Sequence, residues 1–116
     1  MDLDGWLFSY GTLRQAEVQR ELFGRVVDSE ADVLPGFRIE TLRITDADVV
    51  ALSGLAEHPV LRRGSPGDTV PGSALRVSEQ DLARADAYEV SDYTRIGVTL
   101  GSGRRAYAYV HRDDAA

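Results

Sequence analysis

Short strand-like segments outnumber helix-like ones in this chain, and only two segments have the periodicity of a helix. A strand buried on one face alternates apolar and polar residues, whereas a strand buried on both faces is a short apolar run. The segments that fit these patterns, or that look extended, are residues 6–10, 25–34, 37–44, 49–55, 70–77, 94–100 and 104–111. Strands and helices do not alternate regularly, which argues against a parallel doubly wound sheet. We therefore expect an α+β fold, in which two short helices pack against a curved, mostly antiparallel or mixed sheet that forms a partial barrel.

The two predicted helices carry recognisable end signals. Residues 15–23 form the first, and Gly24 follows at the position where helices often end in a left-handed residue. The second opens at Ser78, where Ser78 and Asp81 resemble a capping box with aspartate in place of the usual glutamate. Its inner stripe is expected to consist of Leu82, Ala85 and Tyr88.

Turn residues predict the connections between the strands. Residues 35–36, Pro-Gly, are a turn signal. Residues 101–106, Gly-Ser-Gly-Arg-Arg-Ala, superficially fit a dinucleotide-binding fingerprint, but that motif needs a helix to follow and here a strand follows. We therefore interpret residues 101–103 as a hairpin turn. Residues 57–69 contain two prolines, two glycines and a pair of arginines, so we expect a long loop there.

Three groups of polar residues are assigned no function by the sequence. The pair Arg62 and Arg63 is expected to be solvated within the long loop, and the alternative is contact with an anionic ligand. His111 stands near the C-terminus at a strand end and is interpreted as a surface histidine. Asp113 and Asp114 are interpreted as an unstructured tail.

Composition excludes several kinds of chemistry. A chain of 116 residues is of ordinary single-domain length, so residues 1–116 are taken as one domain. The chain has no cysteine and only two histidines, which excludes thiol catalysis and favours no metal site. All thirteen basic residues are arginine, so no lysine is present to form a Schiff base. The net charge of −6 argues against a nucleic-acid partner.

The sequence also favours a cytoplasmic protein without a membrane partner. Residues 1–4 are acidic and lack the positive start and apolar run of a signal peptide. No stretch approaches the ~20 apolar residues that are needed to cross a bilayer.

The first candidate site is the turn after the strand at residues 6–10. Residues 8–13 read Phe-Ser-Tyr-Gly-Thr-Leu, a buried strand that runs directly into a tight turn. Consecutive backbone N–H groups at such a turn can point the same way and bind an anion, and Gly11 lets a ligand approach the main chain. The alternative is an ordinary connection between strand and helix, in which Thr12 makes a local hydrogen bond.

The second candidate is Glu89, at the end of the second helix. It is flanked by Tyr88 and lies close to Tyr93 in sequence. Aromatic surroundings remove water from a carboxyl group and raise its pKa towards the range that suits acid–base catalysis. The alternative is a solvated glutamate at a helix end. Arg95 has a structural alternative of its own, an ion pair with Asp86 or Asp92.

The ordered set of motifs resembles the gamma-glutamylcyclotransferase-like family, which includes the gamma-glutamylamine cyclotransferases. The family's opening Tyr-Gly-Thr/Ser-Leu is similar to residues 10–13, and its middle motif of glycine and an aromatic residue is similar to residues 36–38. A proline-bearing loop that leads to Val-x-Gly is similar to residues 59–72. The late motif resembles Tyr88-Glu89, Tyr93-Thr94-Arg95 and Val98. Two positions depart from the pattern: Val90 replaces a small residue, and His58 replaces an aromatic one.

The resemblance implies an enzyme that acts on a small gamma-glutamyl amine or peptide. The substrate's α-amino group would attack its own γ-carbonyl and form 5-oxoproline, with no metal or cofactor. Glu89 would be the catalytic acid and base, and the substrate would be bound by Tyr10, Gly11, Thr12 and Leu13. Tyr93, Arg95 and Tyr109 would support the pocket. The alternative is a binding module of the same fold without catalysis, which the departures at His58 and Val90 keep open.

Overall fold

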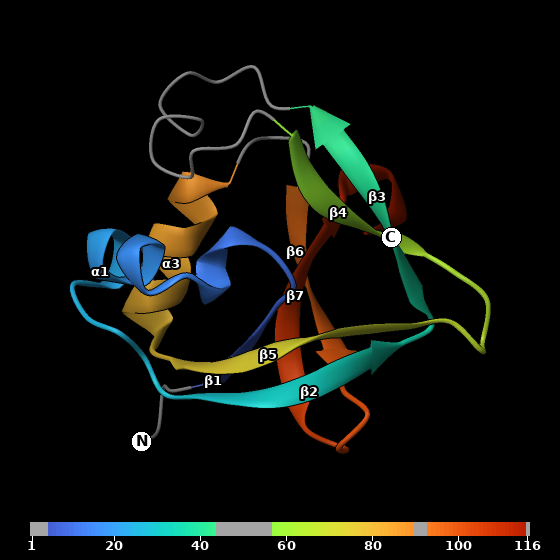
Figure 1. The fold of residues 1–116 in the computed structure, drawn as a ribbon, viewed down its shortest axis with the longest axis horizontal. Helices are drawn as coiled ribbons and strands as arrows, with labels where there is room; N and C mark the ends of the chain where they lie inside the picture. Colours follow the sequence, from blue (N-terminus) through green and yellow to red (C-terminus); the bar gives the residue numbers. More distant parts are fainter. Residues whose placement is uncertain (1–4, 44–56, 90–92, 116) are drawn as a thin grey trace.

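The protein is described here by a computed structural model that covers residues 5–43, 57–89 and 93–115 (Figure 1). Its strands are β1 (Gly5–Ser9), β2 (Ser29–Pro35), β3 (Phe37–Arg43), β4 (Glu57–Arg63), β5 (Thr69–Val77), β6 (Tyr93–Thr99) and β7 (Arg105–His111). Its α-helices are α1 (Ala16–Phe23) and α3 (Glu79–Tyr88), and its 3-10 turns are η1 (Thr12–Arg14) and η2 (Arg112–Asp114). The expected α+β architecture is confirmed: the strands form one mixed sheet that does not close, and α1 and α3 lie together at one side of it (Figure 1).

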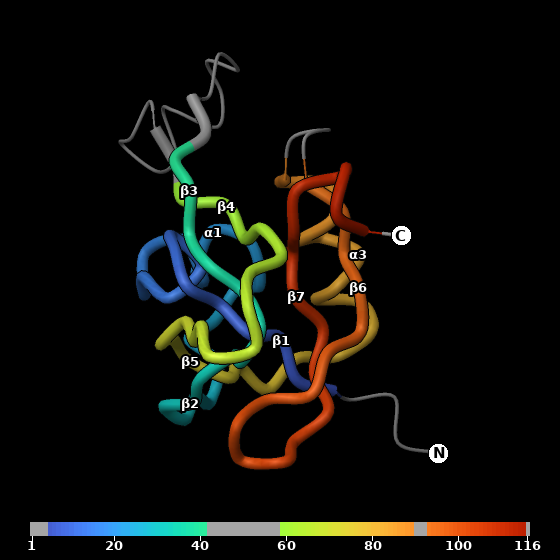
Figure 2. The backbone as a smooth tube through the Cα atoms, turned by 90° about the vertical axis from the view of Figure 1, so that its right-hand side faces the viewer, coloured from blue at the N-terminus to red at the C-terminus, as the bar shows by residue number. Residues whose placement is uncertain are grey.

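Strand β7 organises the sheet. The strand order is β2-β5-β1-β7-β4-β3, and β6 pairs antiparallel with β7 along its whole length. Strand β1 runs parallel to β7 and pairs at Leu7↔Tyr107 and Phe8↔Ala108, and β4 runs parallel to it at Leu61↔Val110. Because β6 occupies one edge of β7, β1 and β4 share the other edge and diverge from each other along it (Figure 2).

The sheet is buried on both faces by two apolar clusters. Leu7 belongs to the cluster beneath the helices, with the buried stripe Leu82, Ala85 and Tyr88 of α3. The next residue, Phe8, belongs to the second cluster, with Ala106, Ala108 and Val110 of β7. Successive side chains of a strand point to opposite faces, so the short apolar run of β1 is buried on both sides, as the sequence predicts.

The predicted helix ends are confirmed. Gly24 follows α1 with φ of 74°, in the left-handed region that suits glycine. The capping box of α3 is complete: the Asp81 N–H donates to Ser78 Oγ at 3.1 Å, and the Ser78 N–H donates to Asp81 Oδ2 at 2.9 Å. Arg25 also donates to both oxygens of Asp81, at 3.0 and 2.7 Å. The Arg25 hydrogen bonds hold the pKa of Asp81 below its usual range, although burial opposes them.

The expected long loop at residues 57–69 is wrong, because most of it is strand β4. Val60 and Leu61 are 2% and 0% exposed, so tertiary burial overrides the turn-like composition. Pro59 is tolerated because its carbonyl faces the Tyr93 hydroxyl, which donates to it at 2.8 Å. In an antiparallel ladder the N and O of one residue point to the same side, so the missing N–H removes no bond to β3.

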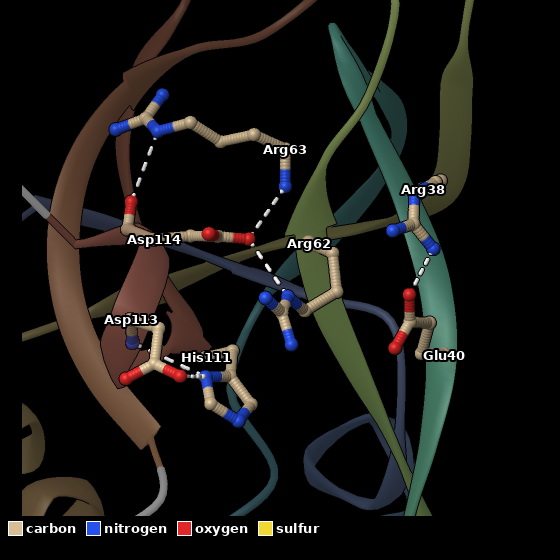
Figure 3. Close-up of polar contacts among 7 residues, drawn as sticks. All are labelled: Arg38, Glu40, Arg62, Arg63, His111, Asp113 and Asp114. Atoms are coloured by element: carbon tan, nitrogen blue, oxygen red, sulfur yellow. Dashed lines mark hydrogen bonds and ion pairs between the residues drawn. The ribbon is translucent and has the colours of Figure 1, made fainter.

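The predicted unstructured C-terminal tail is wrong as well, and the prediction of a solvated arginine pair holds only for Arg63, which is exposed, whereas Arg62 is partly buried. Asp114 lies in η2 and accepts hydrogen bonds from Arg62 Nε at 2.8 Å and from the Arg63 N–H at 2.9 Å (Figure 3). Nδ1 of His111, which is partly buried, accepts the Asp113 N–H at 3.1 Å. The charge-assisted bonds of Asp114 to Arg62 and Arg63 attach η2 to β4.

Three further predictions concern the hairpin turn, the strand at residues 49–55 and membrane-spanning segments. The hairpin turn before β7 is confirmed, with Gly103 at φ of 90°, and the Ser102 hydroxyl donates to Asp32 at 2.6 Å. The strand expected at residues 49–55 lies outside the described residues. Neither α1 nor α3, nor any other helix in the described ranges, has the length and apolar character of a membrane span.

Gly72 in β5 provides a test of this packing. A Cβ atom at Gly72 would collide with the Ser9 carbonyl oxygen and would lie 2.7 Å from Phe8 Cζ. We expect Gly72→Ala to lower the free energy of unfolding by about 1–3 kcal/mol through overpacking, measured by urea unfolding. Gly67→Ala is the matched control, because a Cβ there meets nothing within 4 Å, and its stability should change little. Equal effects of the two substitutions would contradict the close contact between β1 and β5.

Candidate active site

A pocket opens where β1 and β4 diverge along β7. It encloses about 330 Å³, counting the part that is open to solvent. The turn after β1, the end of α3 and strands β4, β6 and β7 all contribute to its wall, through Phe8, Ser9, Tyr10, Gly11, Thr12, Leu13, Pro59, Glu89, Tyr93 and Tyr109. The structure thus brings all five sequence-predicted site residues, Glu89 and Tyr10 to Leu13, to one cavity.

The side chain of Tyr10 spans the gap between the two parallel strands. Pairing of β1 with β7 ends at Ala108, and pairing of β4 with β7 is at Val110. Between them, the carbonyl of Tyr109 accepts a hydrogen bond from the Tyr10 hydroxyl at 2.7 Å. Burial raises the pKa of Tyr10 well above its usual value, and the nearby Tyr93 and Glu89 raise it further. Tyr10 is therefore a neutral wall of the pocket at physiological pH.

The turn after β1 presents a row of backbone N–H groups. The Arg14 N–H donates to the Gly11 carbonyl at 3.2 Å, and Arg14 Nη2 donates to the Tyr10 carbonyl at 3.1 Å. In contrast, the N–H groups of Gly11, Thr12 and Leu13 have no hydrogen-bond partner among the residues that the structure describes. A Cβ atom at Gly11 would lie 3.2 Å from Pro59 Cγ, so a side chain there would crowd the pocket wall. The turn can therefore offer main-chain donors to an anionic group.

Two buried side chains hold this turn against the helices. Thr12 Oγ1 and the Tyr88 hydroxyl are hydrogen-bonded at 3.2 Å, which ties the turn to the last residue of α3. Gln19 is 3% exposed; its Nε2 donates to the Leu13 carbonyl at 2.9 Å, and its Oε1 accepts the Val27 N–H at 3.1 Å. Thr12 therefore bonds to a residue far away in the sequence instead of making the local hydrogen bond that was considered for it. Nothing in the sequence indicated that Gln19 would hold this turn.

Glu89 caps the C-terminus of α3 and is partly buried at the pocket. Its N–H donates to the Ala85 carbonyl at 3.0 Å, which ends the helix at this point. Burial raises the pKa of the Glu89 carboxyl to about 8, and the negative charge of Asp86 adds to the effect. The carboxyl group is therefore mostly protonated at pH 7, the direction that its aromatic surroundings predict.

A polar network is centred on Asp86, which lies three residues before Glu89 on α3 and binds side chains from β6 and β7. Arg95 Nε and Nη2 donate to the two oxygens of Asp86, each at 2.9 Å, and the Tyr109 hydroxyl donates to Asp86 Oδ1 at 2.6 Å. Burial raises the pKa of Asp86, but the hydrogen bonds from Arg95 and Tyr109 outweigh it and hold that pKa below its usual range. Burial and the bond to Asp86 raise the pKa of Tyr109. Of the two partners considered for Arg95, the structure shows Asp86, and Asp92 lies outside the described residues.

The remaining sequence-based predictions for the site have mixed outcomes. Tyr93 and Tyr109 line the pocket as expected. Arg95 does not line it and instead donates hydrogen bonds to Asp86. Pro59 lines the pocket too, although the sequence analysis placed it in a loop. Val90 and the side chain of His58 lie outside the described part of the structure. Across residues 5–43, 57–89 and 93–115, no cluster of three or more histidine, aspartate or glutamate side chains is arranged to hold a metal ion.

Comparison with known proteins gives one family match. A family model described as gamma-glutamyl cyclotransferase, AIG2-like, matches residues 7–116. The search among curated proteins found no significant match.

Three solved structures are similar to this chain in fold. A solution structure of an Arabidopsis thaliana protein is 23% identical with a TM-score of 0.75, and the match covers 97% of this chain and 65% of the plant protein. A structure named gamma-glutamyl cyclotransferase is 17% identical with a TM-score of 0.73, covering 93% of this chain and 66% of that one. An uncharacterized human protein is 18% identical with a TM-score of 0.71, covering 95% and 68%. This chain thus spans slightly less than two thirds of the first two structures.

The protonation of Glu89 is testable through the stability of the fold. The folded chain holds the Glu89 proton up to a pKa of about 8, whereas the unfolded chain releases it near the ordinary value of 4.5. Between these values the folded state binds more protons, so this group makes the free energy of unfolding fall as the pH rises, by at most about 1.4 kcal/mol per pH unit. Glutamine does not titrate, and Glu89→Gln removes this slope.

Urea unfolding of both proteins from about pH 5 to pH 8 measures the effect. We expect the wild type to lose stability relative to Glu89→Gln steadily as the pH rises. Parallel stability curves for the two proteins would contradict a raised pKa.

Proposed function

Because the chain belongs to the AIG2-like gamma-glutamyl cyclotransferase family, we propose that it converts a gamma-glutamyl amine or amide into 5-oxoproline and releases the free amine. The observation that supports this proposal most is that Glu89 lines the same pocket as residues 11–13. The N–H groups of these three residues have no hydrogen-bond partner in the described part of the structure. The finer assignment of roles to these residues is part of the proposal.

The proposed reaction needs no nucleophile from the protein. The substrate's α-amino nitrogen forms a bond to its own γ-carbonyl carbon, and the bond from that carbon to the leaving nitrogen breaks. One proton leaves the attacking nitrogen, and one proton joins the leaving nitrogen. The pocket must therefore hold the substrate folded for attack, a positioning effect that supplies ~7–11 kcal/mol in favourable cases.

Glu89 carries the proton in this proposal. Its carboxylate takes the proton from the attacking nitrogen and returns it to the leaving nitrogen, a transfer that is typically worth ~10²–10⁴-fold in rate. A pKa of about 8 supports the role, because a group that titrates near neutral pH both accepts and donates protons readily. A bound α-ammonium group beside Glu89 would favour the ionised carboxyl, since an opposite charge at close range lowers the pKa of an acid. The ammonium group must lose one further proton before its nitrogen can attack, and the released amine takes up that proton and leaves as its ammonium form.

The turn after β1 binds the glutamyl part of the substrate in this proposal. The N–H groups of Gly11, Thr12 and Leu13 provide hydrogen-bond donors for the α-carboxylate or for the oxyanion that develops at the γ-carbonyl. Backbone donors of this kind need no reorganisation during the reaction, because the bonds of Thr12 to Tyr88 and of Leu13 to Gln19 already fix the turn.

A panel of gamma-glutamyl amines and dipeptides tests the proposal, with 5-oxoproline as the measured product. Glu89→Gln keeps the size of the side chain but takes up no proton, so we expect turnover to fall by about 10²–10⁴-fold. Substrate affinity, measured by titration calorimetry, should remain within a few-fold. Glu79→Gln is the matched control, because Glu79 lies exposed at the opposite end of α3 and should leave turnover unchanged.

Two outcomes would count against the proposal. Turnover by Glu89→Gln at the wild-type rate would remove Glu89 from the mechanism. Binding of the substrates by the wild type without any 5-oxoproline would favour the non-catalytic binding module.

A further inference from the structure

We propose that Asp86 is a positioning residue of this site. It binds the Arg95 guanidinium and the Tyr109 hydroxyl and keeps a fixed negative charge one helical turn before Glu89, so that Glu89 remains the carboxyl group that exchanges a proton. The inference rests on the proposed role of Glu89 in catalysis. It concerns a residue that does not line the pocket and acts through its hydrogen-bond partners.

The two carboxyl groups are neighbours on α3. Residues three apart on a helix lie on the same face, about 5–6 Å apart at their Cβ atoms, so Asp86 and Glu89 interact directly. Two like charges at this distance disfavour each other, and the carboxyl with the better partners ionises first. Asp86 is 42% exposed, so water weakens its charge and the effect on Glu89 is modest.

Hydrogen bonds favour the ionised form of Asp86, and Glu89 lacks them. Asp86 accepts two bonds from Arg95 at 2.9 Å and one from the Tyr109 hydroxyl at 2.6 Å. Glu89 accepts none from any residue that the structure describes. Several charge-assisted hydrogen bonds strongly favour the ionised form of a carboxyl group, whereas burial without any hydrogen bond favours the protonated form. Asp86 therefore stays charged at neutral pH, and Glu89 keeps its proton.

The groups that face Glu89 from the surrounding elements do not compensate for this lack of donors. Three tyrosines line the pocket with it, one from each neighbouring segment, and each hydroxyl donates elsewhere. Tyr10 donates to the Tyr109 carbonyl at 2.7 Å, and Tyr93 donates to the Pro59 carbonyl at 2.8 Å. Tyr109 donates to Asp86. On α3 itself, Tyr88 is bonded to Thr12. Arg95 reaches this region through Asp86, whose charge it partly balances.

Burial is the largest cause of the raised pKa of Glu89, and Asp86 is the second. Replacing Asp86 by asparagine removes the charge but retains a carbonyl oxygen of similar shape that accepts hydrogen bonds. Replacing Arg95 by glutamine has the opposite electrostatic effect, since it leaves the charge of Asp86 without its balancing cation. The two substitutions perturb the same network and remove charges of opposite sign.

The test is an NMR titration of the Glu89 carboxyl carbon in the free protein, compared for the wild type, Asp86→Asn and Arg95→Gln. We expect the Asp86→Asn substitution to lower the Glu89 pKa by about half to one pH unit. We expect Arg95→Gln to leave it unchanged or to raise it. If the network only supports the structure, either substitution admits water to Glu89, and the pKa falls in both variants.

Two results would overturn the inference: a lowered pKa in both variants, or an unchanged pKa in Asp86→Asn. If Asp86→Asn does not fold, Arg95→Gln still decides, because a lowered pKa there contradicts the proposal and an unchanged or raised one supports it. The titration needs no substrate, so its outcome stands even if no 5-oxoproline is ever formed. With an active substrate, the acid limb of kcat/KM should shift in Asp86→Asn by the same amount and in the same direction.

Discussion

One edge of β7 is shared by two parallel strands that cannot both follow it to its end. β1 occupies this edge at Ala108 and β4 occupies it at Val110, and the strands separate at Tyr109. The chain after β1 must therefore turn away at Tyr10, which creates both the pocket and the turn that lines it. The Tyr10 hydroxyl bonds to the Tyr109 carbonyl at the point of separation. The position of the site thus follows from the sheet topology, and the end of α3 is brought to it through the bond between Tyr88 and Thr12.

The pocket places the Glu89 carboxyl among tyrosine side chains whose hydroxyl groups donate to other residues. An ionised carboxyl that is partly removed from water and accepts no hydrogen bond is costly. The same cost raises the pKa of the Glu89 carboxyl. The hydroxyl groups of Tyr10, Tyr93 and Tyr109 donate to other acceptors, so none of them donates to the Glu89 carboxylate. Under the proposed reaction, the substrate's amino group supplies the missing partner. The same arrangement that makes Glu89 a poor contributor to stability at alkaline pH suits it to proton transfer.

Local signals predicted the parts of this fold that depend on local structure. The capping box at Ser78, the left-handed Gly24 and the hairpin before β7 are short-range features, and all three are confirmed. Strand β4 was missed because its proline suggests a loop, while the reason that it forms a strand is burial against residues far away in the sequence. The turn after β1 and Glu89 were identified by the resemblance to a family. The network around Asp86 was only partly foreseen: its bond to Tyr109 joins residues 23 apart, and no spacing rule indicates such a contact.

The central claim is that Glu89 and the backbone of the turn after β1 act on one and the same small molecule. A crystal structure of the protein with 5-oxoproline, the product of the proposed reaction, tests it most directly. The account predicts that an oxygen of the product accepts hydrogen bonds from the N–H groups at residues 11–13, with the Glu89 carboxyl within hydrogen-bond distance of the ring nitrogen. A product bound away from this pocket, or a Glu89 carboxyl turned away from the bound ring, would contradict it.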